Sequence, residues 1–176
     1  MKKLKLSALL LMIAGLFAGC KDDDKAPRNS FTYGEEEYGL ASAEAQYIYN
    51  DGDFYYWYLV LTSDGITFDE SQSWYTGTGE VVWLTLGNYG EAADELPTGT
   101  FVFPEKKKTS SVEVYSFGVN FSFDSPAEEK EYPLAEATVT ITKKGSEYII
   151  DFTFMSDSDE TVTGHFTGIV KKVVIT

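Results

Sequence analysis

Short runs of apolar and aromatic residues with a period of two, separated by turn residues, fill the chain from residue 31 to residue 176. Such alternation indicates strands with one buried face, and clusters of Gly, Asp, Asn and Pro between the runs indicate turns. No part of this region shows sustained helical periodicity, and residues 91–96 could form one helical turn at most. We therefore predict an all-β domain with about nine strands, arranged as an antiparallel meander that closes as a β-barrel or folds as a sandwich.

The strands can be placed from this pattern. The Asp51-Gly52 pair is a strong hairpin signal between two of them. A looser stretch with Phe68, Trp74 and Tyr75 separates two others. The predicted strands are 31–33, 38–40, 43–49, 54–62, 81–86, 100–103, 112–123, 137–142, 147–155 and 161–170, the last of which could continue to 176.

The C-terminal third has the clearest alternation. In 137–142, Val139 and Ile141 point one way and three threonines point the other. Gly164 and Gly168 fall on the apolar face of the last strand, which would let that strand curl tightly, as barrels require. The other residues predicted to face the core are Tyr148, Ile150, Phe152, Phe154, Val162, Phe166 and Val170.

The first 19 residues have the layout of a bacterial export signal. Lys2, Lys3 and Lys5 precede a run of 13 uncharged residues that ends at Ala18. This run is too short for a transmembrane helix, which takes about 20 apolar residues. Ala18, Gly19 and Cys20 resemble a lipobox, in which cleavage between Gly19 and Cys20 leaves an acylated cysteine. Cys20 is the only cysteine in the chain, so it has no internal disulfide partner.

The residues after Cys20 suggest where the protein lies. Lys21, Asp22, Asp23 and Asp24 resemble the surface-export tag of Bacteroidetes lipoproteins; a merely solvated linker is the alternative. We expect a signal peptide (1–19), a lipidated tether (20–29) and one β-domain (30–176). The predicted location is the outer membrane. The acyl chains on Cys20 would insert into the membrane lipid, and the domain would face the cell exterior.

Charge restricts the partners of this domain. The formal net charge is −14, and loss of the three signal-peptide lysines would take it to −17. Nucleic acids and anionic membrane surfaces would be repelled by such a protein, so we predict no nucleic-acid partner.

Several motifs resemble those of a known group. They are Thr-Val-Thr-Ile-Thr-Lys-Lys-Gly-Ser-Glu-Tyr (138–148), Thr-Gly-His-Phe-Thr-Gly (163–168), Leu-Thr-Ser-Asp-Gly (61–65) and Leu-Pro-Thr-Gly-Thr-Phe (96–101). This set of motifs resembles the one found in uncharacterised Bacteroidetes surface lipoproteins with a calycin-like, or lipocalin-like, β-barrel domain. The resemblance covers most of the chain after Cys20 and implies a fold. It supplies no catalytic residues, and a ligand cavity follows from it only by analogy.

Residues for catalysis or metal binding are few. His165 is the only histidine, and alternation places it on the Thr163 and Thr167 face, at the surface. No nucleophile-elbow motif accompanies it, and zinc sites favour Cys and His. Acidic turns at Asp51 and Asp53, and at Asp157, Asp159 and Glu160, are a weak calcium signal that solvated hairpin tips explain equally well. We predict no metal, no cofactor and no enzymatic activity.

Aromatic residues carry the functional hypothesis. The strand 54–62 is aromatic on both faces, because Tyr55, Trp57, Leu59 and Leu61 can face the core only if Tyr56, Tyr58 and Val60 face elsewhere. We predict that Tyr56 and Tyr58, joined by Trp74 and Tyr75, bind a ligand, although tyrosine also suits strands for packing reasons alone. The ligand would be a glycan or a small hydrophobic molecule. The alternative is an envelope interaction protein that docks another surface protein through this sheet face.

Overall fold

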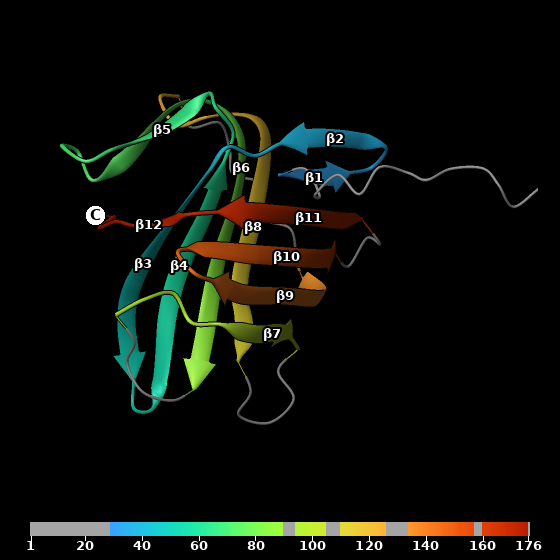
Figure 1. The fold of residues 1–176 in the computed structure, drawn as a ribbon. Helices are drawn as coiled ribbons and strands as arrows, with labels where there is room; N and C mark the ends of the chain where they lie inside the picture. The colour runs from blue at the N-terminus through green and yellow to red at the C-terminus, as the bar shows by residue number, and fades with distance from the viewer. Residues whose placement is uncertain (1–28, 90–93, 105–109, 126–133, 157–159, 176) are drawn as a thin grey trace, which may run out of the picture.

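All the regular secondary structure is β-strand in the part of the chain that the structure, a computed structural model, describes: residues 29–89, 94–104, 110–125, 134–156 and 160–175 (Figure 1). The prediction of an all-β domain is confirmed for these residues. The described residues form twelve strands, where about nine were predicted: β1 (Ser30–Tyr33), β2 (Glu36–Gly39), β3 (Ser42–Asp51), β4 (Phe54–Thr62), β5 (Ile66–Asp69), β6 (Trp74–Tyr89), β7 (Gly99–Phe103), β8 (Ser111–Ser122), β9 (Leu134–Lys144), β10 (Glu147–Ser156), β11 (Thr161–Gly168) and β12 (Val170–Lys172).

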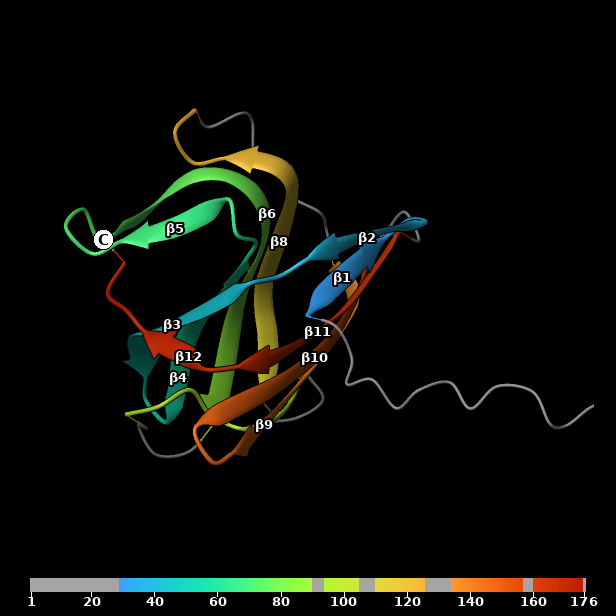
Figure 2. The same ribbon diagram turned by 45° about the horizontal axis from the view of Figure 1, so that its top comes forward.

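One strongly curled sheet forms a half-barrel. Its strand order is β12-β3-β4-β6-β8-β7-β9-β10-β11-β1-β2, and β5 pairs with β6 outside this path. Figures 1 and 2 show the curl from two directions. Two of the pairings, β12 with β3 and β7 with β8, are parallel. The predicted antiparallel meander is therefore wrong for these two pairings, because adjacent strands in space are not always consecutive in the chain.

Two walls of this sheet face each other. We call β3, β4, β6 and β8 the first wall, and β7, β9, β10, β11 and β1 the second wall; Figure 1 shows the strands of the second wall running across those of the first. The C-terminal segment joins the walls, because β11 pairs with β10 and β1 whereas β12, beginning after Ile169, pairs with β3.

The main core lies between the walls and uses the faces that the alternation predicts. In β10 the side chains of Tyr148, Ile150, Phe152 and Phe154 are all buried. In β9, Val139 and Ile141 are buried while Thr138 and Thr142 are exposed. In β4 the inward residues are Trp57, Leu59 and Leu61, all in the same core cluster. Burial of these rings and aliphatic chains is the main force that holds the walls together.

A second, smaller core lies on the outer side of the first wall. It contains Val60, Ile66, Tyr75 and Val81, against which Phe68, Trp83, Phe121 and Phe123 pack. The β5–β6 hairpin covers this cluster, since Ile66 pairs with Gly77 and Asp69 with Trp74. The strands predicted from the sequence do not include β5, and the strand that corresponds to β6 was predicted to begin too late, at residue 81. The Ser- and Gly-rich composition of 71–79 reads as a loop, and its strand geometry depends on packing against the first wall.

The C-terminal segment also covers a buried carboxylate on this outer side. Glu44 of β3 is 7% exposed, and Lys171 lies beside it in the parallel pairing of β12 with β3. The Gln46 side chain holds the end of the chain, because its Nε2 donates to the Ile175 carbonyl at 3.3 Å and its Oε1 accepts from the Ile175 N–H at 2.5 Å. Burial raises the pKa of the Glu44 carboxyl, although the Ser42 hydroxyl and the Lys171 charge oppose the shift.

Glu44→Gln should therefore change the pH dependence of stability. A carboxyl whose pKa is raised on folding stabilises the protein at low pH, and that contribution is lost as the pH rises through the folded pKa. Relative to the wild type, the variant should gain on the order of 1 kcal/mol in free energy of unfolding between about pH 4 and about pH 8. Urea unfolding across this range measures the difference. Glu35→Gln, at an exposed turn, is the control and should follow the wild type; a Glu44→Gln curve parallel to the wild type would contradict the assignment.

Candidate functional site

The outer side of the first wall carries a row of aromatic side chains, which we call the aromatic face: Tyr49, Tyr56, Tyr58, Trp74 and Trp83. Tyr56 and Tyr58 point outward because the alternate residues of β4 fill the main core, as predicted. Trp83 of β6 pairs with Val60 and shares its outward direction. Tyr49 joins the row through a register shift in β3 between Tyr47 and Tyr49.

The rings of the aromatic face contact one another in two groups. Tyr49 stacks on Tyr56 with ring centroids 4.5 Å apart and an interplanar angle of 22°. Trp83 contacts both Tyr58, at 5.5 Å, and Trp74, at 5.8 Å. The edge-to-face and stacked geometries are those that aromatic quadrupoles favour. Because Tyr56 and Tyr58 are alternate residues of one strand and project from the same side, the two groups lie next to each other.

Part of this face is accessible to solvent. Tyr49 is 53% exposed and Trp74 is 40% exposed, the largest values among the described aromatic residues. Tyr56, Tyr58 and Trp83 are half-buried. Burial, followed by the proximity of Tyr49, raises the pKa of the Tyr56 hydroxyl, so this group remains a neutral hydrogen-bond donor at neutral pH.

Tyr75 is placed differently from the other three predicted ligand-binding residues. Its side chain is 1% exposed, stacks on Phe123 at 5.2 Å and touches Trp83 with its edge at 5.9 Å. Its buried hydroxyl has no hydrogen-bond partner among the described residues, and burial, with the charge of Glu44 second, raises its pKa. Tyr75 therefore supports Trp83 from beneath rather than reaching the surface.

Two members of the aromatic face were missed at the sequence level. Trp83 could have been found, because it alternates with the core residues Val82 and Leu84 in a predicted strand. Tyr49 could not, because alternation from Ala43 and Ala45 points position 49 inward until the register shift reverses it. The predicted lipidation and export residues, Gly19, Cys20 and Lys21–Asp24, lie outside the described residues.

His165 lies on the outer side of β11, as predicted, and has two side-chain partners. Its Nδ1 is 2.6 Å from Oδ1 of Asp151, and its Nε2 is 2.9 Å from Oγ1 of Thr167. In the part of the chain that the structure describes, no group of three or more His, Cys, Asp or Glu residues could hold a metal ion. Asp157 and Asp159 of the predicted acidic turn lie outside that part.

Two of the hollows formed by the described residues lie at the surface and outside the main core. One is on the outer side of the second wall, around His165, and the other is lined by residues such as Leu40, Ser63 and Gly79. The space between the walls is filled by large side chains, including Trp57, Phe101, Phe154 and Phe166, all at most 2% exposed. The interior thus differs from the open lumen that a lipocalin uses for small ligands.

Comparison with known protein families, with curated proteins and with solved structures found no match to this chain. The described residues form no helix long and apolar enough to cross a membrane.

Proposed function

We propose that the protein is a lipid-anchored lipoprotein of the bacterial outer membrane that faces the cell exterior and binds a glycan through the aromatic face. The observation that carries this proposal is the set of neighbouring, partly exposed rings, of which Tyr49 and Trp74 are the most exposed. Acylation of Cys20 would anchor the chain, and the export tag at Lys21–Asp24 would direct it outward. Both assignments rest on the sequence motifs and the resemblance to Bacteroidetes lipoproteins.

The chemistry of the rings favours a sugar. The face of an aromatic ring carries partial negative charge, and the C–H groups on one side of a pyranose ring carry partial positive charge, so the two surfaces attract. The Tyr49 and Tyr56 rings are nearly parallel, and the Trp83 ring joins Tyr58 to Trp74. Such a row can contact successive sugar units, while tyrosine hydroxyls and the indole N–H can bond to sugar hydroxyls.

The other candidate ligands have less support. A small hydrophobic ligand would need an apolar cavity, whereas Trp57, Phe101 and Phe154 occupy the interior. Docking of another surface protein is the second candidate function, because tyrosine and tryptophan often dominate the binding energy of protein interfaces. The net charge of −14 disfavours an acidic polysaccharide, which the protein would repel. A neutral glycan is therefore the preferred ligand.

Tyr58→Ala should weaken glycan binding about fivefold, because it removes one ring contact worth about 1 kcal/mol. Affinity electrophoresis of the purified protein in gels that contain soluble starch, xylan, mannan or laminarin measures this change. Tyr58→Phe keeps the ring and should retain most of the retardation by the polysaccharide that binds. Tyr38→Ala is the matched control, since Tyr38 is a half-buried tyrosine of β2 that stacks on Phe31. Equal retardation of the wild type and Tyr58→Ala in every gel would refute the proposal.

A further inference from the structure

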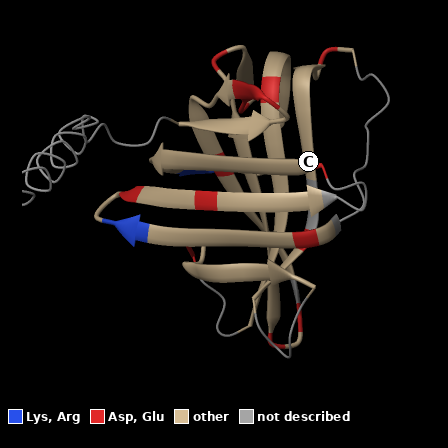
Figure 3. Cartoon of the chain, turned by 90° about the vertical axis from the view of Figure 1, so that its right-hand side faces the viewer, with Lys and Arg blue, Asp and Glu red and all other residues tan. Residues whose placement is uncertain are grey.

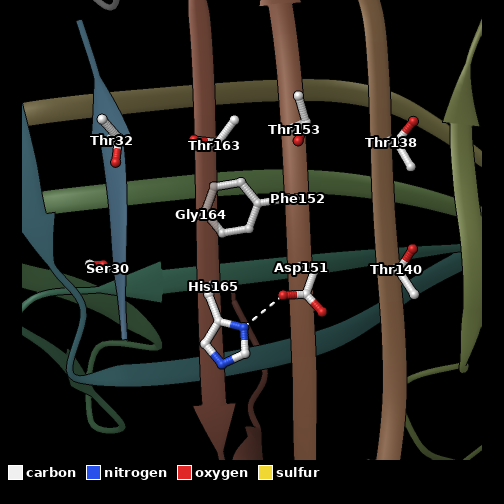
Figure 4. Close-up of a pocket in the computed structure, with 10 residues that line it drawn as sticks. All are labelled: Ser30, Thr32, Thr138, Thr140, Asp151, Phe152, Thr153, Thr163, Gly164 and His165. Carbon is white, nitrogen blue, oxygen red and sulfur yellow. Dashed lines mark hydrogen bonds and ion pairs between the residues drawn. The ribbon is translucent and has the colours of Figure 1, made fainter. Parts of the chain in front are cut away.

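A second polar site lies on the outer side of the second wall, away from the aromatic face. The hollow around His165 has a volume of about 490 Å³ and is lined by side chains of β1, β9, β10 and β11. Figure 4 shows these side chains as two rows across four neighbouring strands. One row consists of Thr32, Thr163, Thr153 and Thr138, and the other of Ser30, His165, Asp151 and Thr140.

The sheet geometry fixes the spacing of these groups. Thr163 pairs with Thr32 on one side and with Thr153 on the other, and Thr153 pairs in turn with Thr138. Neighbouring strands lie about 4.8 Å apart, and alternate residues of a strand about 6.8 Å apart. The array is therefore rigid and regular. Between the rows, Gly164 presents only its backbone, because the Phe152 ring occupies its other side, 2.2 Å from where a Cβ would lie.

His165 and Asp151 have fixed orientations within the array. The imidazole bonds to Asp151 through one nitrogen and to Thr167 through the other, and only 18% of its side chain is exposed. The Asp151 side chain is 60% exposed, and its second oxygen has no partner among the described residues. This oxygen can accept hydrogen bonds from a ligand without any loss of the bond to His165.

The four threonines of the first row have free hydroxyls. Thr138, Thr153 and Thr163 are exposed and Thr32 is half-buried, and within the described ranges none of the four hydroxyls has a hydrogen-bond partner. Each hydroxyl can both donate and accept. The lining contains neither Lys nor Arg, and Figure 3 shows that charged positions are few along β9, β10 and β11. An anion would meet the Asp151 carboxylate and find no Lys or Arg in the lining.

We propose that this hollow is a second saccharide site, which takes a neutral sugar through its hydroxyl groups. A sugar offers several hydroxyls at fixed spacing, each able to donate and to accept, and a carboxylate oxygen accepts from such hydroxyls strongly. The site lies on a different wall from the aromatic face, so it adds a polar contact to the ring contacts of the proposed function. Sugar binding in this hollow does not depend on sugar binding at the aromatic face.

The test uses His165 as a reporter, since it is the only histidine of the chain. Nuclear magnetic resonance of an untagged protein resolves its ring protons, while soluble malto-, xylo-, manno- and laminari-oligosaccharides are titrated. We expect saturable shifts with at least one of these sugars. The double variant Thr153→Val/Thr163→Val removes two hydroxyls and keeps β-branched side chains, and it should weaken the apparent affinity about tenfold. Thr142 of β9 is likewise an exposed threonine but lies outside the hollow, so Thr142→Val should bind as the wild type does.

Two results would overturn the proposal. One is an absence of shifts at His165 with the whole set of sugars, and the other is unchanged affinity in the double variant while its unfolding curve remains that of the wild type. Tryptophan fluorescence, recorded in parallel, separates the two sites. A sugar that changes tryptophan emission but leaves the His165 signals in place binds the aromatic face alone, so the second site fails while the proposed function stands.

Discussion

Phe152→Ala should lower the free energy of unfolding by about 3–5 kcal/mol, the usual cost of removing a buried phenylalanine ring. The Phe152 side chain is 3% exposed and lies in the main core. Its ring stacks on Phe154 at 5.2 Å and covers Gly164 of the neighbouring strand. Urea unfolding, followed by circular dichroism, measures the change.

A second substitution makes this prediction specific to the ring. A Cβ on Gly164 would lie 2.2–2.8 Å from three atoms of the Phe152 ring, so Gly164→Ala should cost about 1–3 kcal/mol through overpacking. In a Phe152→Ala background the same change should cost much less, because the space is then vacant. Additive effects of the two substitutions would show that the ring does not occupy the place described.

Gly77→Ala should destabilise the protein by about 2–4 kcal/mol, through backbone strain and a steric clash together. Gly77 has a φ of 97°, and a Cβ there would lie 2.3 Å from the carbonyl oxygen of Gly65. The Cβ would clash with a backbone oxygen, so no change of rotamer can relieve the contact. The clash should detach the β5–β6 hairpin, which carries Tyr75 onto Trp83. Denaturant unfolding and a red shift of tryptophan emission report the effect.

Gly39→Ala is the matched control for Gly77→Ala. A Cβ on Gly39 would meet nothing within 4 Å, and Gly39 has no unusual φ. Its alanine variant should unfold within about 0.5 kcal/mol of the wild type, as surface substitutions usually do. If Gly77→Ala were equally mild, the close approach of the hairpin to Gly65 would be wrong.

Alternation in the sequence predicted most of the main core correctly. Tyr148 to Phe154 in β10, and Trp57 to Leu61 in β4, face inward where a period of two places them. The turn at Asp51-Gly52 also forms, with a φ of 62° at Gly52. These features depend on neighbours in the chain, so a single sequence contains the information.

Features that depend on distant partners could not be predicted in the same way. The parallel pairing of β12 with β3 joins residues such as Val170 and Ala43, and nothing local specifies it. The pair of Asp151 and His165 likewise depends on the β10–β11 register. At the candidate site, the outward direction of Tyr56 and Tyr58 was predictable, whereas the burial of Tyr75 follows from the hairpin that folds over the second core.

The most direct test of glycan binding is a tryptophan fluorescence titration of the purified protein with soluble starch, xylan, mannan and laminarin, with and without acrylamide as a quencher. Trp57 is buried, whereas Trp74 is 40% exposed and contacts Trp83, so a ligand on the aromatic face must change the environment of Trp74. The proposed function predicts a saturable change in emission and protection of the exposed tryptophan from acrylamide with at least one polysaccharide. Emission and quenching that stay the same with all four would contradict it and would leave protein docking as the better explanation of the aromatic face.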